Sequence, residues 1–354
     1  RRASVHERAG AFTTALQDVA RARRLLASAD DASTRVTTVR LDAITAHVRN
    51  MQNRPKDAHD WALRAVTGAR EVDDHETLVR ALMTLDFADM QMGNLDIGER
   101  LREALEICVR EGFLSRESIA RANLGTLAYF AGDWTAAADL YSSSREAALE
   151  AGNAFGAAET DVNLGELLIN QGRFDEAEAV LADAVRVLRA SGAVTFLAIG
   201  ELQQARLHLS RGDVEAGEEL ATRTHESVRA LGQMTTAMEA ALIRADAITR
   251  DGRAEEALEV IAAAEREARS DAAYSLPRTC IQRARALVAL GRFDEAHEMV
   301  LTGLEAAREQ GLPYEEALLF RLWSRVHRHR GDPGRADEAL ARTAETMSRL
   351  GVAG

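Results

Sequence analysis

Few residues in this 354-residue chain have the types and spacing that catalysis or metal binding requires. Of the nine histidines, only His327 and His329 lie close together, and two residues apart on a helix they point to different faces. Cys108 and Cys280 stand far apart, outside any C-x-x-C pattern, so we expect no zinc site or disulfide framework. The sequence also lacks zinc-protease, serine-nucleophile and glycine-rich nucleotide-binding motifs. We therefore predict no enzyme activity, no cofactor and no metal site.

Charged residues follow a more regular arrangement, which suits ion pairing or ligand binding. Glu239 and Asp246 are followed about 40 residues later by Arg278 and Arg285. Two interpretations stay open. The four residues form ion pairs between neighbouring structural elements, or they form a polar ladder for a peptide or a charged ligand.

The C-terminal region carries a second group of charges, the basic residues Arg321, Arg325 and Arg328. A basic end on an acidic protein gives a directional surface that attracts an acidic partner, a phosphate group or another subunit. The alternative is local pairing with acidic residues that follow in the sequence. These are Asp332, Asp337 and Glu338.

Composition limits the architecture that positions these residues. Hydrophobic residues make up 46% of the chain and only four residues are proline, which favours an all-α protein. The net charge of -12 argues against general nucleic-acid binding, because that requires basic surface to neutralise phosphates. No apolar run approaches the roughly 18 residues that span a membrane, so we expect no membrane association and a cytoplasmic location.

Turn signals repeat at intervals of about 40 residues, which indicates an array of similar units. Each unit is expected to contain two helices, so residues 32–354 would form eight helix pairs of an α-solenoid. Residues 1–31 would form an N-terminal helix or cap. The expected turns lie near Asn53, Gly93, Gly132, Gly172, Gly212, Gly252, Gly291 and Gly331.

Small residues recur at a fixed place in each second helix, five positions after the turn. Seven positions before the turn the residue is also small, with Asp86 as the exception. Small side chains allow the two helices of a pair to cross closely. The residues after the turns are Ala58, Gly98, Ala137, Ala177, Gly217, Ala257, Ala296 and Ala336.

Segments 123–141 and 163–181 carry a Leu-Gly pair, a turn glycine, a small residue and a large apolar residue, and so resemble the tetratricopeptide (TPR) family. The resemblance covers nearly the whole chain, but the period is about 40 residues instead of 34 and the closing proline is absent. This longer variant resembles the C-terminal TPR arm of bacterial, notably actinobacterial, MalT/LuxR-type or cyclase/STAND-ATPase signalling regulators. The resemblance implies a right-handed superhelix in which eight pairs make close to one turn.

By the same resemblance, the first helix of each pair lines a concave groove. Aromatic and methionine side chains expected there would form an adaptable apolar surface, or would pack between neighbouring helices. They are Phe87, Met90 and Tyr129. The charged groove residues are Glu159, Glu166, Arg206, Glu239, Asp246, Arg278 and Arg285.

The predicted function is a protein- or peptide-interaction module, as the regulatory or sensor arm of a larger bacterial signalling or transcriptional regulator. An alternative is a sensor domain in which a small effector relieves autoinhibition of an attached STAND-type ATPase. The expected partner is a protein or peptide in the groove, with a small effector or a second copy of the chain, bound through a solenoid end, as further candidates.

Overall fold

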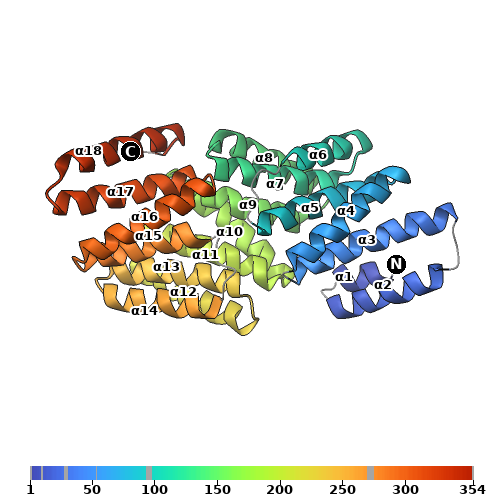
Figure 1. The fold of residues 1–354 in the computed structure, drawn as a ribbon, viewed down its shortest axis with the longest axis horizontal. Coiled ribbons are helices and arrows are strands. Elements are labelled where there is room, and N and C mark those ends of the chain that lie inside the picture. The colour runs from blue at the N-terminus through green and yellow to red at the C-terminus, as the bar shows by residue number, and fades with distance from the viewer. Residues whose placement is uncertain are drawn as a thin grey trace. The chain divides into compact units, whose positions relative to one another are not determined.

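The computed structural model is helical. It describes residues 2–8, 11–27, 31–52, 54–92, 98–268 and 275–352. These residues form helices and contain no strand, which confirms the all-α class (Figure 1). Two compact units make up the chain, unit 1 (Arg1–Leu124) and unit 2 (Gly125–Gly354), and the division falls inside α7.

Unit 1 begins with two short helices where the sequence predicted one. Ala11, which precedes the second of them, has φ -80° and ψ 59°, outside the helical region. The sequence has glycine at position 10, a residue that disfavours helix interiors. The helices are α1 (Arg2–Arg8), α2 (Phe12–Leu26), α3 (Ala32–Met51), α4 (Pro55–Glu71), α5 (His75–Gln91), α6 (Glu99–Glu111) and the first part of α7 (Leu114–Ala131).

Unit 2 continues the alternation of helices and short turns. Each helix packs against the next one along the chain, and α9, α11, α13, α15 and α17 also pack against one another in sequence, as in an α-solenoid. The helices after α7 are α8 (Trp134–Glu150), α9 (Ala154–Asn170), α10 (Phe174–Ser191), α11 (Val194–Ser210), α12 (Val214–Ala230), α13 (Met234–Arg250), α14 (Ala254–Ala268), α15 (Leu276–Ala289), α16 (Phe293–Glu309), α17 (Pro313–His329) and α18 (Pro333–Arg349).

Six of the eight predicted turn residues are glycines in the left-handed region, which closes the preceding helix at low cost. Their φ angles lie between 71° at Gly291 and 87° at Gly212. An aspartate follows several of these glycines and caps the next helix; Asp213, for example, accepts a hydrogen bond from the Ala216 amide. The other two predicted turn residues, Asn53 and Gly93, lie outside the described residues.

The small residues are found at close helix crossings. A Cβ atom added at Gly165 would lie 2.5 Å from Leu181 Cδ2, and Ala177 in the second helix of the same pair has no exposed surface. The exception, Asp86, is also buried, and its carboxylate accepts hydrogen bonds from the Gly98 amide and from Arg100. Here a polar contact replaces the close crossing.

The first and last helix pairs of unit 2 contact each other. Leu350, at the end of α18, belongs to the same buried cluster as Trp134 and Leu167. The ring centroids of Trp134 and Tyr314 are 5.1 Å apart, and Gln171 Nε2 donates to the Leu350 carbonyl at 3.3 Å. The turn therefore closes within unit 2, instead of requiring all eight predicted pairs.

The Gly165 crossing predicts how substitution changes stability. We expect Gly165→Ala to lower the free energy of unfolding by about 1–2 kcal/mol, because overpacking against buried Leu181 outweighs the gain in helix propensity. Gly334→Ala is the control, since its nearest neighbour would be Asp332 Oδ1 at 3.8 Å. It should raise stability by up to about 1 kcal/mol. Denaturant unfolding of the two variants measures the difference, and equal effects would contradict the packing argument.

Candidate functional site

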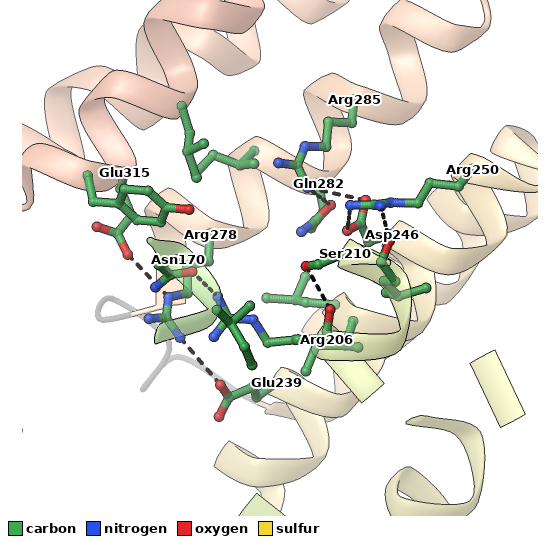
Figure 2. Close-up of a pocket in the computed structure, with 17 residues that line it drawn as sticks. Asn170, Arg206, Ser210, Glu239, Asp246, Arg250, Arg278, Gln282, Arg285 and Glu315 are labelled. Atoms are coloured by element: carbon green, nitrogen blue, oxygen red, sulfur yellow. Dashed lines mark hydrogen bonds and ion pairs between the residues drawn. The ribbon is translucent and has the colours of Figure 1, made fainter. Parts of the chain in front are cut away.

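Arg278 lies at the centre of a polar network inside unit 2. Its guanidinium nitrogens lie 3.1 Å from a carboxylate oxygen of Glu166, 3.3 Å from one of Glu239 and 3.3 Å from one of Glu315. The three carboxylates come from α9, α13 and α17, whereas Arg278 belongs to α15. Figure 2 shows Arg278 between Glu239 and Glu315. One arginine therefore connects four helices.

A second arginine, Arg206 on α11, extends this network. It donates to Glu166 Oε1 at 2.8 Å and to Asn170 Oδ1 at 2.8 Å. The Tyr129 hydroxyl accepts a hydrogen bond from Asn170 Nδ2 at 2.6 Å and donates to Glu166 Oε1 at 3.2 Å. Gln203 Oε1 accepts from Arg206 at 3.0 Å. Every odd-numbered helix from α7 to α17 contributes to these contacts, which we call the central network.

The central network holds its charges in a largely buried position. Burial alone would raise the pKa of Glu166, but Arg206 and Arg278 together keep it below its ordinary value. Glu239 is different, because burial raises its pKa more than Arg278 lowers it. Burial and the nearby Glu166 carboxylate raise the pKa of Tyr129, so its hydroxyl stays a neutral donor.

A cavity of about 170 Å³ lies against the central network. Arg206, Glu239 and Arg278 line its polar side, and Leu242 and Leu318 line its apolar side. Figure 2 shows the labelled side chains converging from several helices. We call the side of unit 2 on which α9, α11, α13, α15 and α17 present these residues the inner face.

A second level of charges lies farther along the inner face. Asp246 on α13 accepts a hydrogen bond from Arg250 at 2.9 Å and one from Arg285 at 3.2 Å. Burial opposes ionisation of Asp246, but Arg285 and Arg250 lower its pKa overall. The ion pairs that the sequence predicted, Glu239 with Arg278 and Asp246 with Arg285, are both present.

An adjoining cavity of about 380 Å³ brings part of the basic end onto the inner face. Arg321 and Arg325 line this cavity together with Arg250 and Arg285. Arg328 does not line it; this residue pairs with Asp337 at 3.3 Å, as the local-pairing alternative predicted. The predicted basic end therefore separates into a paired residue and two residues that face a cavity.

Glu159, on α9, lies apart from the central network. Burial raises its pKa to about 7. Within the described part of the chain, it makes neither an ion pair nor a side-chain hydrogen bond. The predicted cluster of Glu159, Glu166 and Arg206 is thus reduced to the Glu166–Arg206 pair, and Glu159 is a carboxylate with little compensation for its burial.

Comparison with known protein families assigns the fold. Residues 88–352 match the model of the MalT-like TPR region. The chain belongs to this family. The prediction of a MalT-like TPR array is therefore confirmed, and folds of the TPR type bind proteins or peptides and are generally non-catalytic.

Solved structures support the fold of this MalT-like TPR region. BtubC from P. vanneervenii matches with a TM-score of 0.50 and 19% identity, over 62% of this chain and 91% of that chain. Yeast Tom70 matches with a TM-score of 0.47 and 15% identity, over 92% of this chain and 61% of that chain. A monomeric IFIT1 mutant matches with a TM-score of 0.46 and 15% identity, over 88% and 72%. No curated protein matches the sequence.

The aromatic residues predicted for the groove have different places in the MalT-like TPR region. Tyr129 is buried, and its ring stacks on Trp134 with centroids 5.6 Å apart. It therefore packs between helices and serves the central network instead of forming an apolar binding surface. Phe87 and Met90 are half-buried on α5 and belong to unit 1.

Several residues of the central network were missed by the sequence analysis. Asn170, Gln203 and Glu315 lie 2, 9 and 16 residues before their turn glycines. Positions seven apart share one face of a helix, so these three form a row beside the rows that the analysis used. Polar residues recurring in this row were a signal that could have identified them.

The described residues contain no group of three or more metal-ligating side chains and no helix long and apolar enough to span a membrane. Cys108 and Cys280 are buried free thiols, and burial raises the pKa of each to about 11. A thiol with so high a pKa is a poor nucleophile at neutral pH. Binding is therefore the chemistry that the site supports.

The central network predicts a strong dependence of stability on Arg278. Arg278→Gln leaves three partly or wholly buried carboxylates without their shared counter-charge, so we expect a loss of about 3 kcal/mol in unfolding free energy. Arg292→Gln is the control, because Arg292 pairs with Glu295 at the surface. Its loss should stay below about 1 kcal/mol. Denaturant unfolding measures both, and equal losses would show that the network does not stabilise unit 2.

Glu159 predicts a dependence on pH. Its pKa is about 7 in the folded protein and near 4.5 when unfolded, so its stabilising contribution is complete below pH 4.5 and lost as pH rises through 7. We expect Glu159→Gln to be more stable than the wild type at pH 8 by about 1–2 kcal/mol, with the difference shrinking toward pH 5. Glu150→Gln, which removes an exposed carboxylate, controls for net charge. A difference independent of pH would contradict the assignment.

Proposed function

We propose that the inner face of unit 2 binds an extended segment of a partner protein. The observation that supports this is the pair of adjoining cavities along α13, α15 and α17, which share Asp246, Arg250, Arg285 and Leu318. A continuous recess with alternating charged and apolar walls suits a peptide, whose side chains alternate in direction.

In this proposal the chain is the regulatory arm of a larger bacterial signalling or transcriptional regulator. The match to the MalT-like TPR region supports this role, because the sequence also resembles the TPR arm of such regulators. Occupation of the inner face would then be the regulatory event. A native polypeptide of only 38.5 kDa, isolated from its own cells, would contradict the role as an arm.

A small-effector sensor is the second candidate, and the polar, partly enclosed first cavity favours it. Its volume of about 170 Å³ is smaller than the roughly 300–1,000 Å³ of clefts that hold drug-sized ligands. The first cavity alone therefore suits a side chain or a very small effector, whereas the two cavities together suit a peptide.

Leu318 provides the test, because it lines both cavities. Peptides selected from a random display library should bind the wild type and lose at least about tenfold in affinity with Leu318→Trp, since the indole fills the recess. The matched control is Leu301→Trp, at a position on α16 that is 40% exposed, and its effect should stay within about twofold. If no selected peptide depends on Leu318, while a cell extract of small metabolites raises the melting temperature, the sensor function replaces this proposal.

A further inference from the structure

Arg321 and Arg325 differ from the other arginines near the C-terminus in having no acidic partner. Both side chains are exposed on α17, one helical turn apart, and neither forms an ion pair or hydrogen bond with the described residues. Their neighbours are all paired. The pairs are Arg328 with Asp337, Arg330 with Asp294, Arg335 with Asp332 and Arg342 with Glu338.

The cavity that these two residues line concentrates positive charge. Its walls carry four guanidinium groups, from Arg250, Arg285, Arg321 and Arg325, and a single carboxylate, from Asp246. That carboxylate already accepts hydrogen bonds from Arg250 and Arg285. The cavity therefore has a surplus of positive charge, in a chain whose net charge is -12.

The surplus is unfavourable for the protein alone. Burial lowers the pKa of Arg321, and the positive charges of Arg285 and Arg325 lower it further. A folded protein with many acidic residues has paired the surrounding arginines but not these two. An anion that enters the cavity would supply the missing charge and form charge-assisted hydrogen bonds with donors that are not yet used.

We propose that this cavity binds acidic side chains of the partner segment that occupies the inner face, an inference that rests on the proposed function. The charge of the cavity is complementary to aspartate or glutamate. Val288, Leu318 and Leu322 lie among the arginines, so apolar side chains between the acidic ones also find contacts. A segment in which acidic and apolar residues alternate fits this wall better than a small inorganic anion does, because an anion leaves the apolar part unused.

The experiment uses fluorescence anisotropy with a labelled peptide in which glutamate alternates with leucine and both ends are blocked. The test variant is Arg321→Gln/Arg325→Gln. Its matched control is Arg328→Gln/Arg335→Gln, which removes the same charge from paired positions on the same two C-terminal helices. We expect the test variant to bind at least about tenfold more weakly than the wild type and the control to stay within about threefold. Replacing glutamate by glutamine in the peptide should weaken wild-type binding by at least about tenfold.

Thermal unfolding separates lost binding from lost folding. The test variant should melt at or above the wild-type temperature, because it relieves repulsion among the arginines. Equal binding by the test variant and the wild type, or equal losses in the test and control variants, would overturn the inference. So would displacement of the peptide by an equal concentration of inorganic phosphate, which would identify a small-anion site. Selected peptides that depend on Leu318 but lack acidic residues would leave the proposed function standing and remove only this inference.

Discussion

The contact between Arg278 and its three carboxylates is the constraint on which the rest of unit 2 depends. Apolar clusters lie between successive helices and hold neighbours together, as in other helical repeats. The Arg278–Glu166 contact is of another kind, because it joins helices three pairs apart on the inner face. A buried guanidinium requires full compensation, so the positions of α9, α13 and α17 are fixed by one charge.

The inner face thus contains two regions with different electrostatics. Around Arg278 the charges are compensated and the donors and acceptors are used, which suits a structural role. Around Arg321 and Arg325 the compensation stops, and the positive charge remains available. A gradient from satisfied to unsatisfied charge along one recess gives an extended ligand a direction, because its acidic part has only one favourable place.

The repeat structure and part of the site could be predicted from the sequence because they depend on local spacing. Glycines at intervals of about 40 residues set the turns, and the same interval aligned Glu239 with Arg278 across neighbouring pairs. The Arg278–Glu166 contact could not be predicted this way, since the residues are 112 apart and meet only because unit 2 closes. Glu315 was missed for a related reason: it lies at the start of α17, on a helix row outside the positions that the family resemblance implied.

Closure of unit 2 changes how such an array is expected to unfold. In an open solenoid each repeat contacts only its neighbours, so the terminal repeats fray first and stability is a sum of local terms. Here Leu350 packs with Trp134 and Leu167, and Gln171 bonds to the Leu350 carbonyl, so opening the last pair also exposes part of the first. Contacts of such long sequence separation slow folding but couple the repeats. Unit 2 therefore behaves less like a chain of modules and more like a single cooperative domain, whose backbone amides share one level of protection against hydrogen exchange.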